Sequence, residues 1–211
     1  MRYAMLMMVV GMLAAAPVHA DERSDALGAL SSSDPRMRKD AAERLGDVGT
    51  MADMPALVRA LRDPDEDTRD AAQQAMWDIW SHSGNAEVDR LFKQGIEQMG
   101  IGDVRGGITT FSRIIAMKPE FAEGWNKRAT LYFLAGDLRK SLADCDEVIK
   151  RNPYHFGALS GYVQIYIRLE YYERALEYSR RALDVNPNLD GIRQRMKALE
   201  KLIDERKAKM I

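Results

Sequence analysis

The side chains best suited to catalysis or metal binding are few in this sequence and fall into no recognised spacing. Beyond the first twenty residues there are two histidines, His82 and His155, and one cysteine, Cys145. Neither histidine stands in a Cys/His/carboxylate spacing that holds a metal. No Ser or Cys lies in a motif that pairs a nucleophile with a base. We therefore expect no enzymatic activity, no metal site and no cofactor.

Two glycine-rich stretches do not change this expectation. Gly100-Ile101-Gly102 and Gly106-Gly107 follow a helical pattern and lack the Lys-Ser/Thr ending of a phosphate-binding loop. The single Cys145 cannot form a disulfide within one chain. It falls on the apolar face of an expected helix, so we interpret it as a core residue, with a reactive thiol as the alternative.

The length and charge of the chain narrow the classes of protein further. Its 211 residues suffice for a buried core in one or two small domains. The formal net charge is −1, so there is no bulk basic surface for nucleic acid or for an anionic membrane. The function that remains is recognition of another protein by a surface, which the helices of the chain must build.

A repeat of 34 residues organises the second half of the chain. Prolines recur at positions 119, 153 and 187, which are 34 apart (153−119 and 187−153). Windows that start at Val88, Ala122 and Phe156 share bulky and small positions on this period. The fourth position is Leu91, Trp125 or Leu159, and the twentieth is Gly107, Ser141 or Ala175. Such a period predicts stacked helix–turn–helix units, and the pattern resembles the tetratricopeptide repeat (TPR).

A second, shorter repeat precedes it. Asp34-Pro35 leads to Asp40-Ala41-Ala42, and Asp63-Pro64 leads to Asp70-Ala71-Ala72, so that the Asp-Ala-Ala core recurs after 30 residues (70−40). In each copy the Asp before Pro can cap a helix that begins at the proline. The pattern resembles HEAT repeats of the phycobilisome-lyase type. Helices are expected over 22–31, 35–45, 52–61 and 64–81. Trp77 and Trp80 are expected to seal the junction of the two arrays, although a membrane-interface or ligand-stacking role is the alternative.

Together these patterns predict an all-α protein, an α-solenoid of helix–turn–helix repeats. The expected segments are a signal peptide (1–20), a HEAT-like segment (21–82), three TPRs (86–187) and a C-terminal capping helix with a basic tail (188–211). Because Glu170-Tyr171 replaces the Gly-Asp of the other two intra-repeat turns, we expect a strained backbone there. An array of two HEAT-like units would be marginal alone, so we expect it to pack on the TPRs.

The first twenty residues predict export. Arg2 precedes the apolar run 4–16, and Ala20 completes a cleavage site before Asp21. A membrane anchor is the alternative, but the run is shorter than the ~20 residues of a comfortable span. The sequence therefore predicts a periplasmic or secreted protein with no stable membrane anchor after cleavage.

The TPR resemblance implies a concave groove lined by the first helix of each repeat. Its groove positions are occupied here by amide, hydroxyl, basic and aromatic residues. The candidate peptide-binding residues are Phe92, Lys93, Glu123, Asn126, Lys127, Thr130, Ser160, Gly161, Gln164 and Arg168. Amides and hydroxyls can hydrogen-bond an extended peptide, and the basic residues suit a carboxylate. Gly157 and Gly161 leave room either for a ligand or for a neighbouring helix.

One known TPR activity is not implied. TPR domains that clamp a terminal carboxylate for cytosolic chaperones use Lys, Asn and Arg at five positions, and these are Phe92, Ile96, Lys127, Gly157 and Gly161 here. The expected function is a non-catalytic scaffold or adaptor that binds a protein or an extended peptide. The alternative is a structural subunit whose groove is filled by its own chain or by a second copy, so that oligomerisation stays open.

Overall fold

The computed structural model describes residues 16–208, with side chains described from residue 21. Within this range the chain is all-α, with eleven α-helices and one short 3-10 turn, η1. The N-terminal helices are α1 (Ala16–Ala29), α2 (Pro35–Val48), η1 (Met51–Asp53), α3 (Met54–Ala60) and α4 (Glu66–Ser81). The later helices are α5 (Ala86–Gly100), α6 (Val104–Met117), α7 (Ala122–Leu134), α8 (Leu138–Arg151), α9 (Phe156–Arg168), α10 (Tyr172–Val185) and α11 (Asp190–Ala208). The expected fold class is confirmed.

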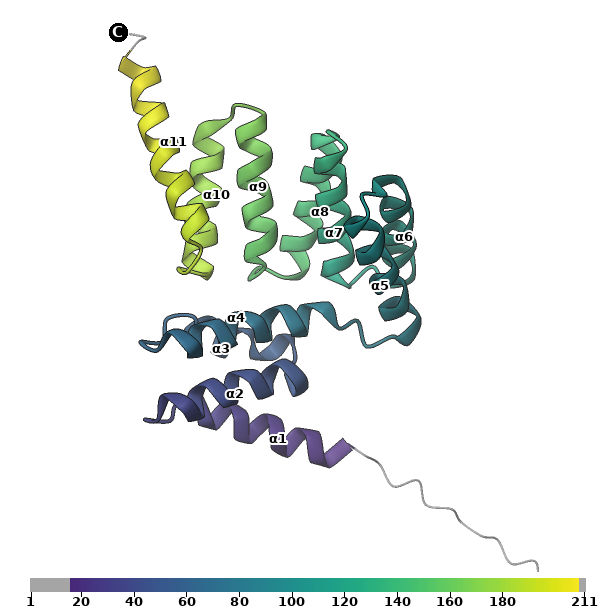
Figure 1. The fold of residues 1–211 in the computed structure, drawn as a ribbon, viewed down its shortest axis with the longest axis vertical. Helices are drawn as coiled ribbons and strands as arrows, with labels where there is room; N and C mark the ends of the chain where they lie inside the picture. The colour runs from purple at the N-terminus through teal and green to yellow at the C-terminus, as the bar shows by residue number, and fades with distance from the viewer. Residues whose placement is uncertain (1–15, 209–211) are drawn as a thin grey trace, which may run out of the picture.

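Helices α5 to α10 form three antiparallel pairs, α5/α6, α7/α8 and α9/α10, stacked side by side (Figure 1). Each pair turns through one residue in the left-handed region: Gly102 (φ 76°), Gly136 (φ 80°) and Glu170 (φ 60°). Glycine takes this conformation without cost, whereas a side chain with a Cβ is strained there. The expected strain in the third turn is confirmed, and it falls on Glu170.

The helix starts of the N-terminal array show two corrections. Helix α1 begins at Ala16, six residues before the expected start at residue 22. Asp34 caps α2 as expected, because its carboxylate accepts from the backbone N–H of Arg36 at 2.9 Å. Helix α4, however, begins at Glu66 and is capped by Asp65, not by Asp63. The second copy has one more residue between Asp-Pro and Asp-Ala-Ala, and this shifts the cap. Asp63 instead receives two hydrogen bonds of 2.7 Å from Arg38 of α2.

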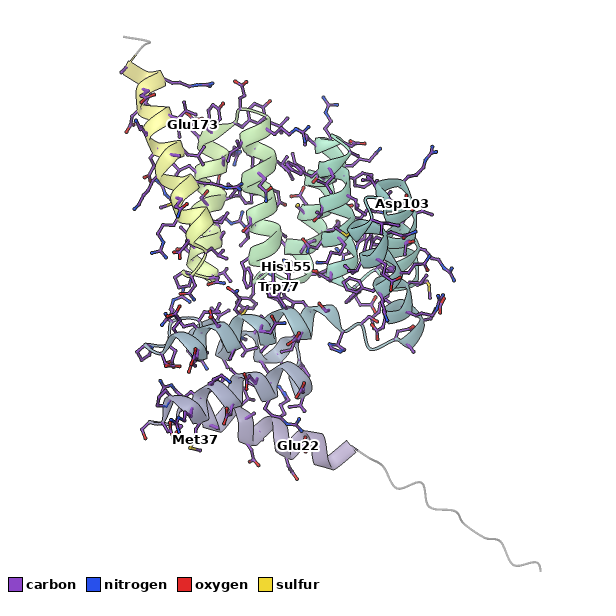
Figure 2. All side chains as sticks on the ribbon, in the orientation of Figure 1. Glu22, Met37, Trp77, Asp103, His155 and Glu173 are labelled. Carbon is purple, nitrogen blue, oxygen red and sulfur yellow. The ribbon has the colours of Figure 1, made fainter. Side chains whose placement is uncertain are left out.

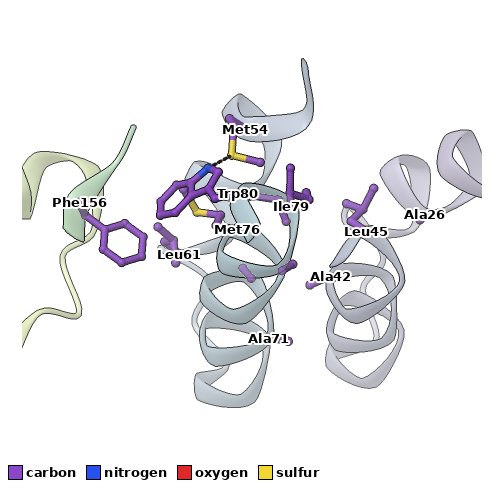
Figure 3. Close-up of a cluster of buried hydrophobic side chains, with 13 residues drawn as sticks. Ala26, Ala42, Leu45, Met54, Leu61, Ala71, Met76, Ile79, Trp80 and Phe156 are labelled. Carbon is purple, nitrogen blue, oxygen red and sulfur yellow. Dashed lines mark hydrogen bonds between the residues drawn. The ribbon is translucent and has the colours of Figure 1, made fainter. Parts of the chain in front are cut away.

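The two arrays share a hydrophobic core. Helix α4 runs crosswise beneath the ends of α7 to α10 (Figure 1). Trp80 and Leu61 of the N-terminal array pack in one cluster with Phe156 at the start of α9 (Figure 3). Farther along, Asn188 Nδ2 donates to Leu61 O at 2.8 Å. The expected packing of the short array on the TPRs, with the tryptophans at the junction, is confirmed.

The last helix covers the open end of the TPR stack. Ile192, Leu199 and Ile203 of α11 are buried and lie on one face of the helix, as a capping helix requires. Residues 209–211 and the expected signal peptide up to residue 15 lie outside the described range. Among the described helices, none combines the length and apolar character needed to span a bilayer.

Candidate peptide-binding groove

A cavity of about 100 Å³ opens between α7 and α9, the first helices of the second and third TPRs. It is lined by Asn126, Ala129, Thr130, Phe133, Ser141, Gly157, Gly161, Gln164 and Ile165. Four of these are candidate binding residues of the sequence analysis: Asn126, Thr130, Gly161 and Gln164. The structure therefore brings part of the candidate site together at one hollow.

The cavity exists because α9 carries glycine where it faces α7 and α8. A Cβ added to Gly161 would lie 3.5 Å from Cys145 Sγ, an ordinary contact, so the space beside it is open. Thr130 and Ser160 donate to the carbonyl oxygens of Asn126 and Phe156, four residues earlier in their helices. Their hydroxyl oxygens retain acceptor capacity, and Gln164 is exposed at the rim.

The other glycine admits the chain's own N-terminal array. A Cβ on Gly157 would lie 2.6 Å from Cη2 of Trp77 in α4, so no side chain fits there. Trp77 also packs edge-on against Phe156 and His155. Figure 2 shows Trp77 and His155 next to each other at the junction of the two arrays. Of the two interpretations of the glycines, helix packing therefore holds for Gly157, while Gly161 faces open space.

Glu123 does not face the groove as expected but lies inside the protein. It is 1% exposed, and its Oε2 is 2.7 Å from His155 Nε2 and 3.0 Å from Asn126 Nδ2. Its Oε1 is 2.7 Å from Lys127 Nζ, an ion pair poorly aligned for a hydrogen bond. Its position in the first turn of α7 places it against the loop that precedes α9.

The protonation of this network follows from its geometry. The backbone N–H of Ala158 donates to His155 Nδ1 at 3.1 Å, so the ring proton must lie on Nε2 and point at Glu123. Burial raises the pKa of Glu123, but its hydrogen bond and electrostatic attraction to His155, together with the charge of Lys127, outweigh it, so that the pKa lies below the usual 4.5. Glu123 is thus a buried carboxylate that ties α7 to α9.

The basic candidates differ in how free they are. Lys127 is committed to Glu123 and also lies over the ring of Trp77, 5.7 Å from its centroid. Arg168 is exposed, lies over the Phe133 ring and donates to Phe133 O at 3.2 Å. Lys93 on α5 is exposed and makes no ion pair with any described residue. The groove therefore keeps two available cations, one on α5 and one on α9.

Phe92 belongs to the core of the first repeat more than to the groove. Its ring packs against Phe111 and Phe121, with centroid distances of 5.9 and 5.5 Å. Sequence reasoning missed that Trp77 lies against Gly157 and that His155 is buried beside it. A signal was present, because His155 occupies the repeat position of the buried Phe121 (155−121 = 34). Among residues 16–208, no three His, Cys, Asp or Glu side chains are grouped as a metal site.

Comparison with known proteins agrees with this architecture. The family model for HEAT repeats matches residues 6–77, and the model for the tetratricopeptide repeat matches residues 158–189. A TPR repeat-containing protein of Rhizobium etli is 34% identical over 126 residues, which are 60% of this chain and 61% of that protein. The chain thus spans about three fifths of that relative's length.

Two solved structures share the fold. The first TPR of Spaghetti (RPAP3), bound to the HSP90 peptide SRMEEVD, has a TM-score of 0.54 at 18% identity and covers 56% of this chain and 93% of its own. The TPR2AB domain of yeast Sti1 in its HSP90 complex has a TM-score of 0.50 at 17% identity and covers 86% and 77%. This protein is therefore a repeat solenoid. More particularly, it carries HEAT repeats in its N-terminal part and a tetratricopeptide repeat in its C-terminal part.

Proposed function

We propose that this protein is a non-catalytic scaffold or adaptor that binds an extended segment of a partner in the groove formed by α5, α7 and α9. The observation that carries the proposal is the cavity of about 100 Å³ between α7 and α9, lined by Asn126, Thr130, Gly161 and Gln164. A peptide side chain enters the cavity while amide and hydroxyl groups at its rim hold the peptide backbone.

The charges of the groove favour a partner segment that carries a carboxylate. Lys93 and Arg168 are exposed cations on α5 and α9, two of the first helices of the repeats, whereas the charge of Lys127 is taken by Glu123. Complementary charge raises the association rate and selects against basic segments. The expected ligand is therefore an extended, acidic peptide segment with one small apolar side chain for the cavity.

The solved TPR structures with HSP90 peptides support peptide binding as the general mode of recognition. They do not indicate which class of peptide this chain would bind. The five positions of the carboxylate clamp are Phe92, Ile96, Lys127, Gly157 and Gly161 in this chain. Lys127 is the one basic residue among them, and it is paired with the buried Glu123. We propose a different peptide class, recognised along its length and not by its end.

Selection from a random peptide library displayed on phage tests the proposal. Enriched peptides should be acidic, and Lys93→Glu should weaken their binding by about tenfold, the effect of one well-placed charge. Lys150→Glu makes the same change at an exposed position on α8 and should leave binding unchanged. If both variants lose affinity equally, or if neither loses any, the peptide does not bind in the groove. Lys127→Glu is unsuitable, since it would place a second carboxylate beside Glu123.

Self-assembly is the second candidate function, and one observation favours it. Trp77 of the same chain already covers the Gly157 end of the groove. A second copy that fills the remaining cavity would give a mass that rises with concentration in light scattering. A strict monomer at the highest attainable concentration excludes this candidate.

We also propose that the protein works in the periplasm or outside the cell. The proposal rests on the positive start, the apolar run and the small residue at Ala20. Expression of the full chain in a bacterium, followed by fractionation and N-terminal sequencing, should give a periplasmic protein that starts at Asp21. A cytosolic protein with an intact N-terminus contradicts export.

A further inference from the structure

A second cavity, of about 160 Å³, lies at the junction of the two arrays, away from the groove. It is walled by Ile79 and Trp80 at the end of α4 and by Phe121 before α7. Polar residues close its rim, and the innermost of these is Asn152, at the end of α8. The cavity thus combines an apolar wall with one buried amide.

Asn152 has an unused donor. The side chain is 1% exposed, and its Oδ1 accepts from the backbone N–H of Tyr154 at 3.1 Å, which fixes the orientation of the amide. Its Nδ2 has no hydrogen-bond partner among the described residues. A buried N–H without an acceptor is unfavourable, so this position requires an oxygen that the neighbouring side chains do not supply.

The next repeat shows what such an asparagine binds. Asn186 lies 34 residues later (186−152), is equally buried, and its Oδ1 accepts from the N–H of Asn188 at 2.9 Å. Its Nδ2 donates to Oε1 of Gln73 in α4 at 2.6 Å. The same backbone position therefore binds a carbonyl oxygen when α4 provides one.

Helix α4 cannot provide one to Asn152. Seven residues after Gln73, two turns along the same face, α4 carries Trp80. The indole N–H is a donor only, and it already donates to Met54 Sδ at 3.2 Å (Figure 3). The acceptor present in the third repeat is thus replaced by an aromatic wall, and the cavity lies beside it.

The charges at the rim favour an anion. Lys118, Arg151 and the carboxylate of Glu120 line the cavity. Because Arg151 is paired with Glu147, Lys118 is the cation that can turn to a ligand. Lys118 Nζ is 3.7 Å from Glu120 Oε1, a loose pair. Arg151 lies over the Trp125 ring, 4.7 Å from the centroid, and donates to Glu147, which keeps it in place.

We propose that this junction cavity binds a small organic acid with an apolar body. A carboxylate oxygen accepts from Asn152 Nδ2, and the apolar body packs on Trp80 and Phe121. A cavity of about 150 Å³ holds a benzene-sized molecule, so a branched acid of five or six carbons fits. The carboxylate comes either from a free acid or from the C-terminal residue of a peptide.

Titration of the whole protein with isovalerate, followed by NMR of the Trp80 indole N–H, tests this site. Isovaleramide, the neutral isostere, should bind about tenfold more weakly, because it loses the charge-assisted hydrogen bond. A short peptide ending in valine, as free acid and as amide, distinguishes the two sources. Binding of the free-acid peptide alone assigns the site to a peptide terminus, and binding of isovalerate assigns it to a free acid.

Asn152→Asp is the decisive variant, since it keeps the shape and the acceptor for Tyr154 but replaces the donor by a negative oxygen. It should weaken isovalerate binding at least about tenfold. Asn186→Asp makes the same change one repeat later, outside the cavity, and should bind as the wild type does. If Asn152→Asp does not fold, Lys118→Met replaces it and should weaken the acid but not the amide.

Three results overturn the proposal: no indole shift with either acid, equal binding of acid and amide, or unchanged binding in the Asn152 or Lys118 variant. In the first case the cavity holds solvent only. The outcome is independent of the groove, because peptides selected for the groove need not shift the Trp80 indole.

Discussion

Replacement of Glu123 by alanine should destabilise the protein more than any other single loss of a charged side chain in the TPR array. The carboxylate accepts from His155 and from Asn126 and pairs with Lys127. Alanine leaves two buried donors without acceptors, at about 1–3 kcal/mol each. Lys127 is 24% exposed and can turn to solvent, so its charge adds little. We expect a total loss of about 3–5 kcal/mol, the range for breaking a buried pair.

The assay is urea unfolding of wild type and variant, followed by the fluorescence of the three tryptophans. Glu173→Ala is the matched control, because Glu173 is the second residue of α10 as Glu123 is of α7, but it is exposed (Figure 2). It loses the favourable interaction with the helix N-terminus, about 0.3–1 kcal/mol, and nothing more. A difference below about 1 kcal/mol between the two variants would refute the reasoning about the buried network.

Three further predictions concern single residues. First, the pKa of Glu123 is lower in the folded than in the unfolded chain, so the stability that its carboxylate contributes is fully present above the unfolded pKa of about 4.5 and is lost as the pH falls through the folded pKa. The difference in unfolding free energy between wild type and Glu123→Gln should therefore be constant at neutral pH and shrink below pH ~4.5. A difference that is constant at all pH values contradicts this. Second, Glu170→Gly should raise the free energy of unfolding in urea by about 0.5–1 kcal/mol, because glycine accepts the φ of 60° without strain and the ion pair lost to Arg206 is exposed. A lower free energy of unfolding would show that this turn is not strained. Third, burial and the nearby Asp144 and Asp146 raise the pKa of Cys145 to about 12. A thiol reagent at pH 8 should therefore label Cys145 only at the rate at which the protein unfolds. Rapid labelling of the native protein would instead indicate an accessible thiolate.

The sequence predicted the repeats well because core positions constrain residue size at a fixed period. The bulky fourth and small twentieth positions predicted the three helix pairs α5/α6, α7/α8 and α9/α10. Ser141 and Ala175 are buried where the pattern requires small side chains. The cap of α4 was wrong because a one-residue insertion between Asp63-Pro64 and the Asp-Ala-Ala core cannot be placed without the structure.

The groove was predicted less completely because it depends on how the two arrays meet. A TPR pattern alone predicts that Glu123 and Lys127 lie on the concave face. The crosswise position of α4 places Trp77 over Gly157 and buries Glu123 against His155. Contacts between residues nearly 80 positions apart, such as Trp77 and His155, leave no periodic signal in a single sequence.

The most direct test of the groove is the affinity of one selected acidic peptide for Gly161→Met and for Gly191→Met. Both substitutions replace a helical glycine, and Gly191 has no heavy atom within 4 Å of an added Cβ. Only the methionine at position 161 fills the cavity between α7 and α9. The account predicts at least a tenfold loss of affinity for Gly161→Met and none for Gly191→Met. Equal affinity of both variants and the wild type would contradict peptide binding at this cavity.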